Sequence, residues 1–66
     1  MEYIYVLVHM GGDWEDMIIF VSKEEAIDAS KKNPYGRVEI FKKNEVMGYS
    51  ATYNFYKNGE LIVNRD

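Results

Sequence analysis

The chain has 66 residues, of which 47% are hydrophobic, 15% aromatic and 29% charged. This composition is too apolar for an intrinsically disordered protein, and the length leaves no room for a second domain, so we expect one domain spanning residues 1–66. The absence of cysteine excludes disulfide bonds and Cys-based zinc sites. The net charge of −3 opposes binding to nucleic-acid phosphates unless the basic residues gather on one face.

The first four residues lack the basic region of a signal peptide, and the longest apolar run is shorter than the ~20 residues that cross a bilayer. We therefore expect no membrane insertion and an intracellular location, in the cytoplasm or, for a viral protein, in the host cytoplasm or the virion. Gly11-Gly12 leads into an aromatic and acidic segment rather than into a lysine and a helix, so it is not a phosphate-binding loop. No cofactor is predicted.

Two strands are predicted in the first third of the chain. Residues 3–8 are aromatic or β-branched apart from Leu7, and both alternating sets are apolar, which indicates a central strand. The turn formers of residues 11–16 follow, and residues 17–21 are a second run of strand type. The two strands are expected to form a hairpin with a long loop.

A helix is predicted to start at Ser22. Glu25 lies three residues after Ser22, which is the capping-box pattern that satisfies two amide donors at a helix start. Asn33-Pro34 ends the helix, because the residue before proline is pushed out of the α region. Its inward face is narrow and made of small residues, namely Ala26, Ile27 and Ser30.

The second half of the chain predicts a third strand and a terminal hairpin. Residues 37–41 alternate with period two, with Val38 and Ile40 inward, and residues 42–50 form a polar connection. Residues 52–56 then face residues 60–63 across Asn58-Gly59, a strong signal for a type I′ turn. The register of this hairpin pairs Lys57 with Glu60, Tyr56 with Leu61, and Phe55 with Ile62.

The predicted fold class is therefore α+β, a small and mostly antiparallel sheet of four to five strands with one short helix on one face, in the order β-β-α-β-β-β. One helix covers only one face of such a sheet. The other face must be covered either by the terminal hairpin, as in a small barrel or sandwich, or by a second copy of the chain. For a dimer we place Tyr3, Tyr5, Phe55 and Tyr56 nearest the interface.

Aromatic residues are the best sequence signal for a protein-interaction surface. Trp14, Tyr49, Tyr53 and Tyr56 are the candidates, because amphipathic aromatic side chains are enriched at interfaces. For Tyr53 and Tyr56 we favour cross-strand packing inside the domain. Trp14 and Tyr49 fall in predicted loops and are the better interface candidates.

His9 and the acidic loop of Asp13, Glu15 and Asp16 form the strongest candidate for chemistry. An imidazole and carboxylates at the end of a strand could converge in a metal or acid/base site. One histidine cannot provide the multi-His spacing of zinc enzymes, and acidic loop residues commonly only solvate a turn. We therefore assign no catalytic residue and no metal ligand, and keep a small metal-binding or enzymatic domain as an alternative.

A third possibility is a nucleic-acid binder that uses the strand from Arg37 to Lys43. Arg37, Lys42 and Lys43 beside Phe41 are a small version of a basic strand with an aromatic for base stacking. The acidic net charge opposes this reading, because phosphate binding needs strong segregation of the basic residues. The alternative is an ordinary solvated strand face, and we do not expect nucleic acid as a partner.

Several segments together are similar to a known group of proteins. The Tyr5-Val6-Leu7-Val8-His9 strand, the acidic loop after it, and the Ser22-Lys23-Glu24-Glu25-Ala26 helix start resemble short uncharacterised domains of large DNA viruses, bacteria and their phages. The resemblance covers residues 3–41, and the hairpin around Asn58-Gly59 looks more like the viral members. That family has no established activity, so the resemblance transfers no catalytic residue and implies a small viral accessory or virion-associated protein.

The leading functional hypothesis from sequence is a non-enzymatic interaction or accessory module that self-associates as a homodimer. It depends on the strands with two apolar faces, on the loop aromatics and on the lack of a catalytic set.

Overall fold

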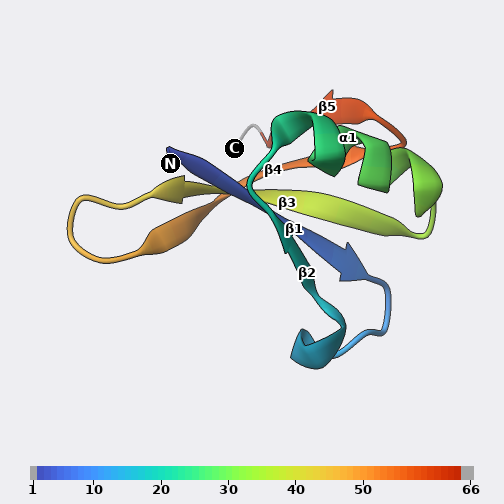
Figure 1. Ribbon diagram of the computed structural model, residues 1–66, viewed down its shortest axis with the longest axis horizontal. Coiled ribbons are helices and arrows are strands. Elements are labelled where there is room, and N and C mark those ends of the chain that lie inside the picture. Colours follow the sequence, from blue (N-terminus) through green and yellow to red (C-terminus); the bar gives the residue numbers. More distant parts are fainter. Residues whose placement is uncertain (1, 65–66) are drawn as a thin grey trace.

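The computed structural model describes residues 2–64 and shows a five-stranded antiparallel sheet with one α-helix packed on one of its faces (Figure 1). In chain order the elements are β1 (Tyr3–His9), the 3₁₀ helix η1 (Trp14–Asp16), β2 (Ile18–Phe20), α1 (Lys23–Lys32), β3 (Gly36–Lys43), β4 (Tyr49–Lys57) and β5 (Glu60–Ile62). The strand order in the sheet is β2-β1-β3-β4-β5. The prediction of a small α+β fold with one helix is confirmed.

Strand β1 lies in the interior of the sheet and is antiparallel to both of its neighbours, β2 and β3. Strands β2 and β3 are therefore parallel to each other, and α1 connects them by crossing over β1, as in a split β-α-β unit. This crossover carries the helix over the middle of the sheet. The predicted hairpin of the first two strands is confirmed, with Val6 opposite Ile19.

Helix α1 starts and ends where the sequence predicts. Ser22 is the N-cap, and its Oγ accepts a hydrogen bond from the backbone amide of Glu25 at 3.3 Å. The Ser22 hydroxyl donates to Oε2 of Glu24 at 3.2 Å, so Glu24 and not Glu25 supplies the carboxylate beside the cap. No helix within residues 2–64 has the length and apolar character that a membrane span requires.

The hydrophobic core lies between α1 and the sheet. Ala26 and Ser30 of the helix are fully buried, and their small size lets the helix lie close to the strands. The remaining buried members of the core are Tyr5, Leu7, Val38, Ile40 and Tyr56, with Phe20, Ile27 and Ala29 packed at its edge. The rings of Tyr5 and Tyr56 lie 6.3 Å apart at an angle of 45°.

The helix is much shorter than the strands beneath it. Its ten residues span about 15 Å, whereas the eight residues of β3 span about 26 Å. In Figure 1 the helix lies over the end of the sheet near the β4–β5 turn, and the β3–β4 hairpin extends well beyond it. Part of the helix-bearing face is therefore uncovered, as is the whole opposite face.

Two polar side chains, Ser30 and Lys57, hold the C-terminal half of the helix and the following turn against the sheet. Ser30 Oγ donates to the carbonyl of Ile27 at 2.7 Å and accepts from the amide of Gly59 at 2.9 Å, which links α1 to the β4–β5 turn. Lys57 Nζ donates to the carbonyl oxygens of Pro34 at 3.0 Å and Gly36 at 3.2 Å. These bonds fix one end of the sheet.

The terminal hairpin has the predicted register, with Phe55 opposite Ile62 and Lys57 opposite Glu60. Asn58 and Gly59 both have positive φ, 52° and 82°, as a type I′ turn requires. Strand β4, however, is longer than predicted and begins at Tyr49, which pairs with Lys43. The polar connection predicted for residues 42–50 is therefore wrong at both ends, because β3 and β4 continue into it.

We predict that Ser30→Ala lowers the free energy of unfolding by about 1–2 kcal/mol, because the Gly59 amide loses its acceptor in a largely buried position. Chemical denaturation measures this loss. Ser50→Ala, at an exposed serine in β4, is the control and should change stability by less than about 0.5 kcal/mol. Equal losses in the two variants would contradict a structural role for Ser30.

Gly59→Val should destabilise the protein more than Gly11→Val, but only by about 0.5 kcal/mol, because the crowding atoms belong to the exposed, flexible side chain of Lys31, which can move aside. Both glycines have positive φ, 82° and 75°, so both variants share the strain of a β-branched residue in that region. At Gly59 an added Cβ would lie 2.5 Å from Cε of Lys31, whereas at Gly11 nothing lies within 4 Å. Thermal melts compare the two, and an equal loss would show that the space beside Lys31 is not limiting.

Candidate interaction surface

The sheet face opposite α1 carries apolar side chains from every strand, and we call it the open face. Successive strand residues point to opposite faces, so the strand positions that alternate with the core residues lie here. They include Ile4, Val6, Val8, Ile19, Phe41, Ala51, Phe55 and Ile62. Val6 is buried although it is not part of the core beneath the helix, because its neighbours on this face surround it.

An ion pair lies in the middle of the open face. Nε of Arg37 is 2.6 Å from Oε2 of Glu39, two residues along β3, and the Arg37 guanidinium carbon is 4.8 Å from the ring centre of Phe55. Glu39 is opposite Val6 on one side and Phe55 on the other, and only 17% of its side chain is exposed. The pair is therefore held in one geometry by an apolar surround and a cation–π contact.

A bulge in β4 places Tyr53 at this face. Glu39 is opposite Phe55 but Phe41 is opposite Ala51, so three β4 residues face Ile40 alone. Thr52 Oγ1 donates to the Ile40 carbonyl at 2.7 Å and accepts from the amide of Asn54 at 3.2 Å. Tyr53 lies between Thr52 and Asn54 and has a φ of 68°, an unfavourable backbone conformation for an aromatic residue. Its side chain is 67% exposed.

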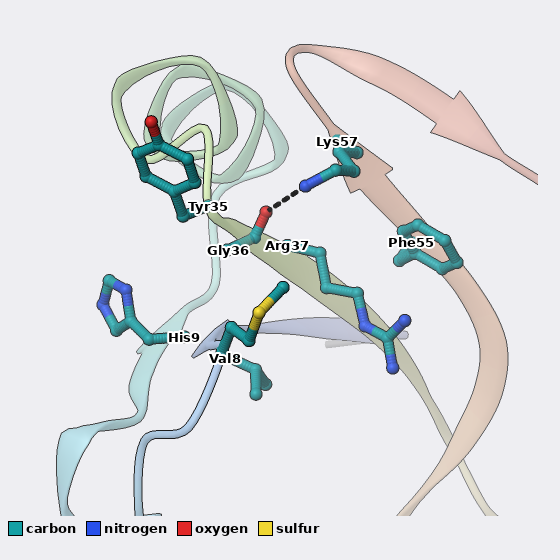
Figure 2. A pocket seen from close by; sticks show the side chains of 8 residues that line it. Val8, His9, Tyr35, Gly36, Arg37, Phe55 and Lys57 are labelled. Carbon is teal, nitrogen blue, oxygen red and sulfur yellow. Dashed lines mark hydrogen bonds between the residues drawn. The ribbon is translucent and has the colours of Figure 1, made fainter.

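Two shallow hollows flank Phe55 on the open face. The first, of about 330 Å³, lies between Phe55 and the end of β1, with Val8 at its floor and His9 and Tyr35 at its rim (Figure 2). The second, of about 390 Å³, lies between Phe55 and the end of β5, where Tyr53 and Ile62 line it. Phe55 therefore stands as a ridge between two depressions.

The basic groups of the first hollow are already engaged within the chain. Figure 2 shows the ammonium group of Lys57 donating to the carbonyl of Gly36, and the Pro34 carbonyl takes a second bond. Arg37 is paired with Glu39. The hollow therefore suits an apolar group better than an anion.

The predicted interface aromatics fall into three positions. Tyr56 is buried in the core beneath α1, so its side chain packs inside the domain and is not a contact surface. Tyr53 is exposed beside Phe55, and Tyr49 shares the open face by its register with Lys43. Trp14 is in η1, outside both hollows, and is 78% exposed. Tyr49 was predicted in a loop and is instead the first residue of β4.

The dimer residues named from sequence divide between the two faces. Phe55 is on the open face, whereas Tyr3 and Tyr5 are on the same face as the helix. Tyr5 is buried there against Tyr56. Placing Tyr5 and Tyr56 at an interface of the uncovered face was therefore wrong, since both belong to the core.

His9 and the acidic loop are arranged as turn structure. The amide of Gly12 donates to the His9 carbonyl, and the amide of Asp13 donates to Oδ2 of Asp16 at 3.1 Å across η1. Within residues 2–64 no group of three or more His, Cys, Asp or Glu side chains is arranged to hold a metal ion. The site proposed around His9 is not assembled in the structure.

The basic strand does not form one basic face. Strand alternation puts Arg37, Phe41 and Lys43 on the open face and Lys42 on the opposite one. Arg37 is further neutralised by Glu39. The charge segregation that phosphate binding would need at this strand is absent from the described residues.

Sequence reasoning missed the Arg37–Glu39 pair and the bulge. The pair had a signal, because opposite charges two residues apart on a strand share a face. The bulge had no sequence signal, because Tyr53 is a residue type common in strands and is neither glycine nor asparagine.

Comparisons with protein-family models, with curated proteins and with solved structures found no significant match to this chain. The resemblance to viral and phage domains stays a prediction.

We predict that Tyr53→Gly raises the free energy of unfolding by about 0.5 kcal/mol, because glycine removes strain of about 1–2 kcal/mol and gives back part of it as chain entropy. Tyr49→Gly, in a regular part of β4, should instead lose about 1 kcal/mol. Urea denaturation compares these two tyrosine variants of one strand. A similar loss in both would contradict the left-handed conformation of Tyr53.

Proposed function

We propose that this chain is a non-enzymatic protein-interaction module that self-associates, with the open face of one copy packed against the open face of a second. The observation that carries the proposal is that this face presents apolar side chains from all five strands and that no element of the chain covers it within residues 2–64. Apolar patches of this extent are uncommon on monomers and mark interaction sites.

The size of the open face matches the lower limit for a specific interface. Strands β1, β3 and β4, spaced about 4.8 Å apart and about 23 Å long, have a projected area of about 330 Å², and the short β2 and β5 add about 100 Å². Accessible area exceeds projected area because side chains roughen the surface. Pairing two open faces therefore removes on the order of 1,000 Å² from water, which a specific complex requires.

The charges of the open face favour a second copy as the partner. At its centre the face has one positive and one negative group, Arg37 and Glu39, so two such faces do not repel each other there. In a two-fold arrangement the Arg37 of each copy can approach the Glu39 of the other, and no charge is buried without a partner. The cation–π contact with Phe55 already orders Arg37, which lowers the entropy cost of association.

The two edge strands allow a matched test. Ile19 of β2 and Ile62 of β5 lie on the open face, whereas their neighbours Ile18 and Leu61 lie on the helix side. All four are between 40% and 63% exposed, so lysine should be tolerated at each of them by the fold. We predict that Ile19→Lys with Ile62→Lys abolishes dimerisation and that Ile18→Lys with Leu61→Lys preserves it.

Sedimentation equilibrium at about 100 μM protein measures the outcome. The unmodified chain and the helix-side variant should have twice the chain mass of 7.8 kDa, and the open-face variant should have a single chain mass. A monomeric unmodified chain would refute the proposal. Equal dissociation of both double variants would also refute it, because the interface would then not be the open face.

A further inference from the structure

A hollow of about 500 Å³ lies on the opposite side of the sheet from the open face, where α1 ends short of the strands. Its walls include Tyr3, Tyr5, Tyr56, Lys23 and Lys42, and we call it the tyrosine–lysine hollow. Lys23 is the first residue of α1, and Lys42 is near the end of β3. The volume lies within the range of small-molecule sites.

The two buried tyrosines of this hollow have unused hydrogen-bond donors. Tyr5 and Tyr56 are only 8% and 6% exposed, and neither hydroxyl makes a hydrogen bond to another residue of the described chain, although buried tyrosines usually do. No side-chain oxygen or nitrogen within residues 2–64 is sealed from solvent without a partner, so both hydroxyls must reach the surface. The hollow is the surface that both residues line.

The tyrosine and lysine side chains around the hollow offer hydrogen-bond donors. Burial raises the pKa of both Tyr5 and Tyr56, so their hydroxyls keep their protons at neutral pH. Lys23 and Lys42 form no ion pair with the described carboxylates, and none of the residues that line the hollow is acidic. Glu24 of the first helical turn is close enough for its charge to contribute to the raised pKa of Tyr5, and its carboxylate accepts a hydrogen bond from the Ser22 hydroxyl.

We propose that the tyrosine–lysine hollow binds a small organic anion, with the phosphate or carboxylate group of the ligand between Lys23 and Lys42. The anionic oxygens accept hydrogen bonds from the hydroxyls of Tyr5 and Tyr56. The carbon skeleton of the ligand lies against the apolar surface that the tyrosine rings and Ile40 provide. Both hollows of the open face lack such a set, because Arg37 and Lys57 are engaged within the chain.

The two lysines that end β3 give a matched test. Lys42 lines the hollow, whereas Lys43 is the next residue and lies on the open face. We would titrate ¹⁵N-labelled protein with phenyl phosphate, benzoate and neutral benzyl alcohol, each to about 10 mM, and follow backbone amide shifts. Saturable shifts should be confined to the strands and helix turn around Tyr5, Lys23, Lys42 and Tyr56, and the tighter of the two anions identifies the preferred charged group.

Lys42→Met should weaken anion binding about tenfold, and Lys43→Met should leave it within about twofold of the unmodified chain. Tyr5→Phe and Tyr56→Phe keep the rings and should each weaken binding several-fold without a change in fold. Shifts from benzyl alcohol as strong as those from the anions, equal weakening by both lysine variants, or no saturable shifts at all would overturn the proposal. None of these results depends on whether the chain dimerises.

Discussion

The single helix is much shorter than the long strands of the five-stranded sheet, and the rest of the structure depends on this difference in length. Helix α1 spans about 15 Å, so its small buried residues Ala26 and Ser30 can lie close to the strands only over part of their length. The core forms where the helix lies, around Leu7 and Val38. Two areas are left without cover, namely the open face and the tyrosine–lysine hollow beyond Lys23.

The two ends of the sheet differ in how completely their polar groups are satisfied. At the helix C-terminus Ser30 accepts from Gly59, and Lys57 donates to two carbonyl oxygens, so donors and acceptors are matched within the chain. At the helix N-terminus the hydroxyls of Tyr5 and Tyr56 have no acceptor among the described residues. Because both hydroxyls reach the surface, they remain available to donate to water or to a ligand in the hollow.

Much of the fold could be predicted because local signals dominate it. Ser22 as the cap, Asn58-Gly59 as the turn and the inward Val38 and Ile40 each follow from short-range physical chemistry, and the structure agrees. The bulge at Tyr53 could not be predicted, because tertiary bonds from Thr52 hold an unfavourable φ. Packing of Tyr56 inside the domain was favoured from sequence, but the side of the sheet on which Tyr5 and Tyr56 lie was missed, since both faces of their strands are apolar and the pattern alone cannot tell which face the helix covers.

Successive side chains of β3 point to opposite faces of the sheet, so the open face and the tyrosine–lysine hollow carry different charged groups. Arg37 and Glu39 point to the open face and neutralise each other, which suits a partner that brings little net charge. Lys42 points to the other face, where it forms no ion pair with the described carboxylates. The chain as a whole has a charge of −3, but exposed charges are screened beyond about 8 Å at physiological salt. Lys23 and Lys42 line the hollow itself, whereas Glu24 acts on Tyr5 from the first helical turn, so the proposed anion site depends on two lysines outweighing one neighbouring carboxylate.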